Sequence, residues 1–191
     1  VAAQMFMAEH ADAEALIFDL RTNGGGGTAQ MDAIFPWLFA EDTPLIRMAT
    51  RREVAARHEA EHHGAEQQDG EPGEEPATFR TIADPQFAIQ EHHALPNGRP
   101  DLVATPVYVL TGPRTASAAE HFTLAMKATG RGTIIGATTA GANHFGGTEI
   151  LPGGYSAFLP VGRAYDIATG EDWEGDGIAP DIAVPVAAAL E

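Results

Sequence analysis

Cysteine is absent from this 191-residue chain, and lysine occurs once, as Lys127. Without cysteine the chain has no disulfide, no thiolate metal site and no cysteine nucleophile. No apolar run approaches the roughly 18 residues of a membrane-spanning helix, and no secretory signal peptide is visible. Only 11 basic residues stand against 27 acidic ones, and the net charge of -16 disfavours binding to nucleic acid or anionic lipid. The remaining composition, with 44% hydrophobic residues, is typical of one globular domain.

Three short apolar runs predict the buried strands of a parallel sheet. They span 15–21, 105–112 and 132–139. A further strand is expected over 43–50. Because these runs alternate with helical segments, the pattern favours α/β layering with right-handed crossovers.

Helical periodicity follows two of the strands, over 28–40 and 115–130. Proline lacks an amide hydrogen, so Pro36 is expected to kink or divide the first helix. Gly130 stands where the C-terminal cap of the second helix belongs. A helix-like pattern also begins at Val1, and we expect a further N-terminal helical segment to precede it.

The last part of the chain is punctuated by glycine and predicts a small antiparallel C-terminal portion. Residues 149–166 have the pattern of a hairpin, and 177–186 that of a closing edge strand. We therefore expect residues 1–191 to form a single α/β domain.

Residues 51–76 differ from the rest of the chain. They contain eight acidic residues, three histidines and almost no large apolar side chain, so we expect a solvated, partly helical insertion. Residues 58–62, His-Glu-Ala-Glu-His, match the H-E-x-x-H pattern of zinc hydrolases. A catalytic zinc site needs a rigid helix and a third ligand. Adventitious metal binding by His58, His62 and His63 is the favoured interpretation, and no metal or organic cofactor is expected.

The stretch Gly-Pro-Arg-Thr-Ala-Ser-Ala-Ala-Glu-His-Phe (112–122) places Ser117 between a strand and a helix. At the first turn of a helix, free N–H groups and the positive end of the macrodipole favour a developing negative charge. Ser117 with the N–H of Ala118 therefore has the pattern of a nucleophile beside an oxyanion donor. The alternative interpretation is that Thr115 or Ser117 only caps the helix.

Four consecutive glycines, 24–27, follow the first predicted strand. Loops at the C-terminal ends of strands are where open α/β sheets bind ligands. The N–H of Gly25 or Gly26 is a candidate for the second oxyanion donor. No Gly-Lys-Ser/Thr follows, so the run does not match a phosphate-binding loop. A flexible tight turn is the alternative.

Three blocks of the sequence together resemble the C-terminal processing (tail-specific) serine proteases. The blocks are ALIFDLRTNGGGG, PVYVLTGPRTASAAEHFTLAMKATGRGTIIGATTAG and LPGGYSAFLPVGRAYDIATGEDWEGDGIAPDIAVPV, 85 of the 191 residues. The chain is more similar to the branch of interphotoreceptor retinoid-binding protein and the tricorn protease. The resemblance implies a crotonase-like (ClpP-like) fold of stacked ββα units and peptide-bond hydrolysis. It implies Ser117 as nucleophile, with Gly25 and Ala118 as oxyanion donors.

The general base is where this sequence departs from the family. The tail-specific branch has a lysine about 25 residues after the serine, and the matching position here is Ala142. Lys127 is ten residues along the helix from Ser117, about 15 Å of rise, which is too far for a dyad. The tricorn-like branch implies a histidine from a segment before the first block, with Glu174 as the carboxylate that orients it.

Three groups near the matching positions are further candidates. His121 follows Ser117 by four residues, so the two side chains share a helix face, although a half-buried packing role is favoured for His121. Glu120 matches the glutamate of the family's Ser-x-x-Glu pattern, where the resemblance implies that it serves the lysine; a carboxylate stabilised by the helix dipole is the alternative. His144, two residues after Ala142, is a candidate participant in catalysis.

The sequence therefore predicts a serine endopeptidase that forms an acyl-enzyme on Ser117 and acts on peptides or unfolded proteins. The rival prediction is a non-catalytic relative that binds apolar ligands or peptides, because Ala142 replaces the family lysine. A zinc hydrolase is a distant third. The family resemblance and the acidic charge lean toward an extracytoplasmic location. The sequence does not predict an oligomeric state.

Overall fold

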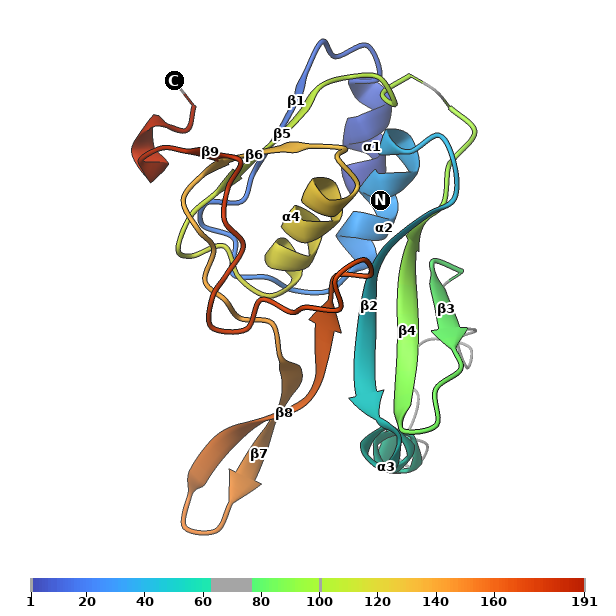
Figure 1. Ribbon diagram of the computed structural model, residues 1–191, viewed down its shortest axis with the longest axis vertical. Helices are drawn as coiled ribbons and strands as arrows, with labels where there is room; N and C mark the ends of the chain where they lie inside the picture. The colour runs from blue at the N-terminus through green and yellow to red at the C-terminus, as the bar shows by residue number, and fades with distance from the viewer. Residues whose placement is uncertain (1, 63–76, 100, 191) are drawn as a thin grey trace.

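Two sheets of different kinds form the framework of the protein (Figure 1). The computed structural model describes residues 2–62, 77–99 and 101–190, apart from the side chains of 58–62. The helices are α1 (Ala2–Glu9), α2 (Ala29–Leu38), α3 (Arg52–His62), α4 (Ala118–Ala128) and the short 3-10 helix η1 (Val186–Ala188). The strands are β1 (Leu16–Asp19), β2 (Thr43–Arg51), β3 (Phe79–Ile82), β4 (Phe87–Ala94), β5 (Val107–Thr111), β6 (Thr133–Gly136), β7 (Phe145–Leu151), β8 (Tyr155–Tyr165) and β9 (Ile182–Ala183).

The first sheet is parallel, with the order β1-β5-β6-β9 in the described residues. It contains the three apolar runs that the sequence predicted as strands, in neighbouring positions. Asp19 pairs with Leu110, and Thr111 pairs with Gly136, so the three strands end side by side. The loops that follow β1, β5 and β6 therefore leave the sheet at one edge.

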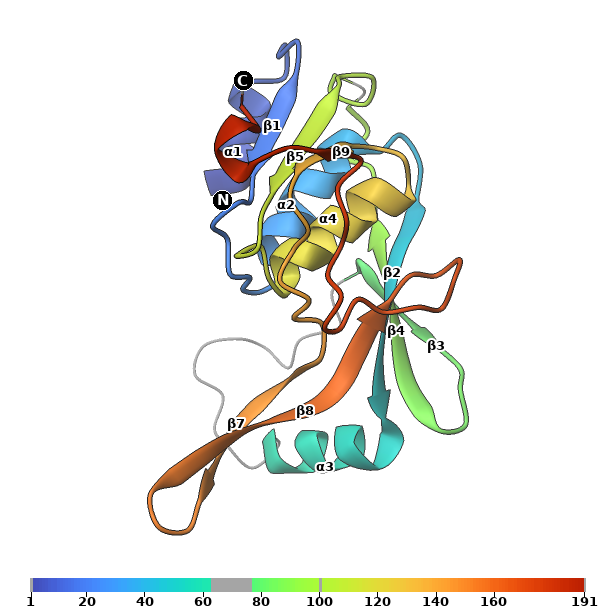
Figure 2. The same ribbon diagram turned by 60° about the vertical axis from the view of Figure 1, so that its left-hand side comes forward.

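The second sheet is antiparallel, with the order β3-β4-β2-β8-β7 in the described residues. It is larger than the small C-terminal portion predicted, because β2, β3 and β4 come from the middle of the chain. The predicted hairpin is confirmed as β7 and β8, and it projects from the body of the protein (Figure 2). The predicted strand 43–50 is β2, and it pairs antiparallel with β4 and β8.

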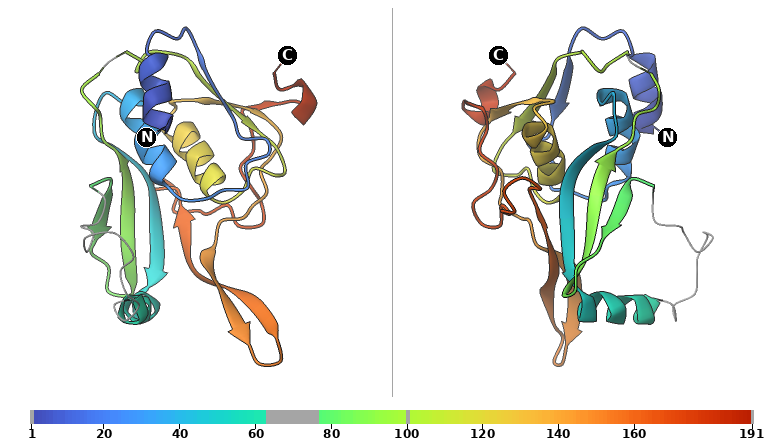
Figure 3. Two further views of the ribbon diagram at one scale, coloured as in Figure 1. Left: turned by 180° about the vertical axis from the view of Figure 1, so that it is seen from behind. Right: turned by 45° about the vertical axis from the view of Figure 1, so that its right-hand side comes forward.

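Helix α4 lies between the two sheets and joins them into one core (Figure 1). It contacts β5 and β6 on one side and β2 on the other. Its inward residues Phe122, Ala125 and Met126 are buried. Helices α1 and α2 pack against each other, as the view from behind shows (Figure 3).

The expected division of the helix at 28–40 is wrong: α2 continues two residues past Pro36. Pro36 lacks an amide hydrogen and lies in the last turn of α2, so only one hydrogen bond of the helix is lost. The helix ends two residues later. The cap at Gly130 is confirmed by its φ of 65° and by its N–H, which donates to the Lys127 carbonyl.

The predicted insertion 51–76 is helical in its first part, as α3. Residues 63–76, including His63, lie outside the described residues. The side chains of His58 and His62 are likewise not described, so the zinc interpretation of this motif stays a prediction. None of the helices in the described ranges has the length and apolar character needed to cross a membrane.

Candidate active site

Three loops meet at the carboxyl edge of the parallel sheet, and hydrogen bonds join them to one another. The Ala116 N–H donates to the Asn23 carbonyl at 3.0 Å, which connects the loop after β5 to the glycine run after β1. The Thr115 hydroxyl donates to the Leu20 carbonyl at 2.7 Å. The Ala140 N–H, in the loop after β6, donates to the Thr115 carbonyl at 2.9 Å. This edge therefore holds Ser117 and both predicted groups of oxyanion donors in one place.

Ser117 is the residue at which the chain turns sharply into α4. Its φ is 55° and its ψ is -123°, and it is the one non-glycine residue with positive φ in the described part of the chain. Such a conformation costs of order 1–3 kcal/mol and persists only where the surroundings impose it. The Ser117 side chain is exposed and forms a capping box with Glu120, so the predicted helix cap is present. No side chain of the described residues hydrogen-bonds the Ser117 hydroxyl. A strained, exposed hydroxyl at a helix N-terminus is typical of a nucleophile.

We expect Ser117→Gly to raise the free energy of unfolding by about 1 kcal/mol. Glycine adopts this φ without strain, and the relief of strain exceeds the extra conformational entropy that glycine loses on folding. Urea denaturation measures the change. Ser156→Gly, at an exposed strand position with ordinary φ, is the matched control and is expected to lose roughly 0.5–1 kcal/mol. A lower free energy of unfolding in both variants would show that Ser117 is not strained.

Gly25 lies directly against the loop that carries Ser117. Its φ is 103°, and a Cβ at this position would lie 2.7 Å from the Ser117 Cβ and 2.8 Å from the Ala116 carbonyl oxygen. Only glycine fits such an approach. The Gly25 N–H donates to Asn23 Oδ1 at 2.9 Å. Gly26 has open space around it, and the Ala118 N–H belongs to the free first turn of α4.

Glu120 is fully buried, and its carboxylate accepts four hydrogen bonds. Oε2 accepts the N–H groups of Ser117 at 2.8 Å and Ala142 at 2.9 Å. Oε1 accepts the Thr139 hydroxyl at 2.5 Å and the Gly141 N–H at 2.7 Å. Glu120 therefore fixes the backbone around Ser117. It also holds Ala142, the position that matches the family lysine, beside Ser117.

Glu174 and His144 lie together, as the candidate roles require. Glu174 Oε2 accepts the N–H groups of Asn143 and His144, each at 2.8 Å. The His144 ring lies 4.0 Å from Glu174 Oε1 through Nδ1 and 3.6 Å from Asp172 Oδ2 through Nε2. Glu174 thus stabilises the loop after β6, with a carboxylate oxygen facing an imidazole.

A buried polar chain behind the site was not predicted from the sequence. His121 Nε2 lies 2.9 Å from His92 Nδ1, and His92 Nε2 lies 2.9 Å from Asp32 Oδ1. The His92 ring is stacked on Phe79 at 4.4 Å. Burial, together with the nearby His92, lowers the pKa of His121 to about 3. These contacts join α4 to β4 and β4 to α2 across 29 and 60 residues of sequence, so no local pattern reveals them.

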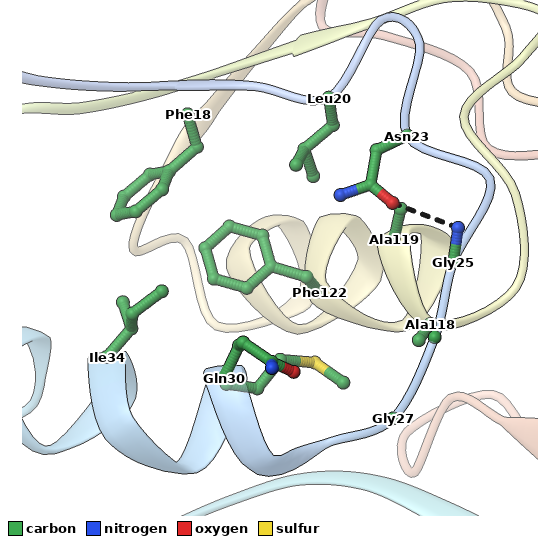
Figure 4. Close-up of a pocket in the computed structure, with 12 residues that line it drawn as sticks. Phe18, Leu20, Asn23, Gly25, Gly27, Gln30, Ile34, Ala118, Ala119 and Phe122 are labelled. Atoms are coloured by element: carbon green, nitrogen blue, oxygen red, sulfur yellow. Dashed lines mark hydrogen bonds between the residues drawn. The ribbon is translucent and has the colours of Figure 1, made fainter. Parts of the chain in front are cut away.

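A cavity of about 360 Å³ lies between the glycine loop and the start of α4 (Figure 4). Gly25 and Ala118, which flank the serine, form part of its wall. Most of the remaining wall is apolar and comes from β1, α2 and α4: Phe18, Leu20, Met31, Ile34, Ala119 and Phe122. The polar side chains in the wall are Asn23 and Gln30. The apolar wall of the cavity suits an apolar side chain held close to Gly25 and Ala118.

Comparison with known proteins places the chain among peptidases. The model of the family described as Peptidase family S41 matches residues 2–184. The photosystem II D1 C-terminal processing protease superposes with a TM-score of 0.62 at 24% identity, over 96% of this chain and 38% of that one. Mature CPAF complexed with lactacystin gives a TM-score of 0.73 at 18% identity, over 98% and 43%.

A lipoprotein from Streptococcus agalactiae gives a TM-score of 0.55 at 19% identity, over 96% of this chain and 56% of that one. These likenesses show a common fold. The chain spans less than two thirds of the length of each of the three structures.

Proposed function

Because this chain belongs to Peptidase family S41, we propose that it is the catalytic part of a serine peptidase. The observation that carries the proposal is the strained turn at Ser117, exposed at the start of α4 with Gly25 packed against it. The peptidase family predicted from the sequence is confirmed. The crotonase-like fold and the tricorn-like branch are part of this proposal.

In the proposed reaction, Ser117 Oγ attacks a peptide carbonyl and its proton passes to a base. The carbonyl oxygen becomes an oxyanion and accepts the N–H groups of Ala118 and of Gly25 or Gly26. The base returns the proton to the leaving amine, and an acyl-enzyme remains on Ser117. Water then attacks the ester and regenerates the serine.

We propose a histidine as the base, oriented by the Glu174 carboxylate, which also stabilises the imidazolium cation. His144 is the histidine that lies beside Glu174 in the described residues. A histidine from outside this chain is the other source, as the family resemblance implies. Glu120 has a different role in this proposal: it holds the backbone of Ser117 and of the loop at 139–142.

The substrate class follows from the cavity between the glycine loop and the start of α4. Its apolar wall favours a peptide with a large apolar residue on the acyl side of the scissile bond, because burial of such a side chain contributes roughly 1.5–3 kcal/mol. Among the described residues, no charged side chain lines the wall to pair with a charged substrate residue.

Replacing Ser117 with alanine in the full-length protein tests the proposal. Hydrolysis of an unstructured peptide is expected to fall by at least about a thousandfold, with Ser156→Ala as the matched control. Activity in the parent should resist a metal chelator. Activity that survives in Ser117→Ala would overturn the proposal, and activity lost to the chelator would favour the zinc interpretation of 58–62.

The rival function is a binding protein without catalysis. The observation that favours it is the lack of a side chain bound to the Ser117 hydroxyl in the described residues, with Ala142 at the lysine position. A parent protein that binds apolar peptides in the cavity but does not cleave them would establish this alternative.

A further inference from the structure

The N–H of Gly25 already has a partner. It donates to Asn23 Oδ1 at 2.9 Å, as the dashed line in Figure 4 marks. An N–H group carries a single hydrogen, so a strong bond to Asn23 competes with a strong bond to a substrate oxyanion. For Gly25 to act as an oxyanion donor, the Asn23 side chain has to release it.

The loop is held in place by contacts that do not involve the Asn23 side chain. The Asn23 N–H donates to the Leu20 carbonyl at 3.0 Å, and the Asn23 carbonyl accepts the Ala116 N–H at 3.0 Å. Gly25 is packed against Ala116 and Ser117. These main-chain contacts remain when the side chain of Asn23 moves, so its amide is not needed to position the loop.

The Gly25 N–H can leave the Asn23 side chain at little steric cost. Neither Gly24 nor Gly26 has a neighbour within 4 Å of where a side chain would start. Glycines on both sides of Gly25 let the peptide plane turn with little steric cost. The Asn23 side chain also forms part of the cavity wall, near Leu20 and Phe122, so a substrate side chain that enters the cavity contacts it.

We propose that Asn23 is a positioning residue that acts as a latch on the oxyanion hole. An apolar substrate side chain entering the cavity displaces the Asn23 amide, and the Gly25 N–H then turns to the substrate carbonyl oxygen. Filling the cavity thereby assembles the catalytic site, a form of induced fit. This inference rests on the proposed function. It adds that the enzyme favours substrates with a large apolar residue through a higher kcat as well as through tighter binding.

The test compares the full-length protein with its Asn23→Ala variant on two peptides that differ only in leucine or glycine on the acyl side. The glycine peptide does not fill the cavity, so removing the latch is expected to raise its kcat about two- to tenfold, the value of one hydrogen bond. The kcat for the leucine peptide should change less, so the preference for leucine falls. If Asn23 only supports the loop, kcat falls for both peptides and the preference is unchanged, which would overturn the latch.

Asn23→Asp supplies a second, opposite readout. Aspartate keeps the acceptor oxygen and adds a charge that binds the Gly25 N–H more strongly, so kcat for both peptides is expected to fall more than tenfold. A loop-supporting role predicts parent-like kcat in Asn23→Asp, which would contradict the latch.

Labelling of Ser117 by a fluorophosphonate separates this inference from the function on which it rests. A parent that is labelled and hydrolyses peptide, with a lower kcat in Asn23→Ala, overturns the latch alone. A parent that is neither labelled nor active overturns the proposed function, and the latch with it.

Discussion

Glu120→Ala is expected to lower the free energy of unfolding by about 3–5 kcal/mol, because it leaves several buried donors without an acceptor. The donors are the N–H groups of Ser117, Gly141 and Ala142 and the hydroxyl of Thr139. They belong to the start of α4 and to the loop after β6, so the variant also loosens the turn at Ser117. Urea denaturation followed by circular dichroism measures the stability.

Glu120→Gln tests whether the carboxylate itself is required. Its single oxygen can serve one pair of donors, while its NH₂ group faces the other pair, so we expect a loss of about 2–3 kcal/mol despite the unchanged size. Glu14→Gln, at an exposed position, is the matched control and should change stability by less than about 0.5 kcal/mol. A Glu120→Gln protein as stable as the control would show that the four hydrogen bonds of the carboxylate do not stabilise the fold.

Acidification is expected to destabilise the protein well above the pH at which carboxylates titrate. His121 is buried and its pKa is lowered to about 3, whereas an unfolded histidine titrates near 6.5. Between these values the unfolded chain binds one more proton than the native protein, so stability falls as pH falls. The loss should approach about 1.4 kcal/mol per pH unit below about 6.5, and urea denaturation between pH 7 and 4.5 measures it.

His121→Gln is the variant that isolates this effect. Glutamine can still donate to His92 Nδ1 but does not titrate, so the free energy of unfolding should vary less with pH between 6.5 and 4.5. The paired carboxylate Asp32 has a lowered pKa in spite of its burial, because it bonds His92, so its own contribution is lost only at lower pH. An unchanged pH slope in His121→Gln would show that His121 is not the responsive group.

Much of the framework was predicted from local pattern. The runs at 15–21, 105–112 and 132–139 form neighbouring strands, and the helix after Ser117 begins and ends close to its predicted bounds. Short apolar runs bounded by glycine predict strands that are buried on both faces. The burial is wrong for β1, which is an edge strand with only Leu16 buried and Ile17 55% exposed. The strands β3 and β4 were missed, since 77–104 mixes polar and apolar residues without a clear period.

The individual residues of the candidate site were predicted from the sequence, but the hydrogen bonds that join them were not. Ser117, Gly25 and Ala118 were identified by their places relative to predicted strands and helices. The role of Glu120 was left open, because its partners at 139–142 are 19 to 22 residues away in the chain. The contact between His121 and His92 spans 29 residues and joins different elements. Contacts at such separations depend on how the elements pack, and a single sequence carries no local signal of them.

The sequence by itself determined the parallel strands, the glycine loop, the serine at the start of a helix and the lack of a lysine at position 142. Each follows from residue type and spacing over a few neighbouring positions. Only the tertiary structure decided that Ser117 is strained and that Glu120 joins two loops. These features exist because three loops from separate strands meet at one edge of the sheet, where packing and hydrogen bonding set conformations that no local pattern specifies.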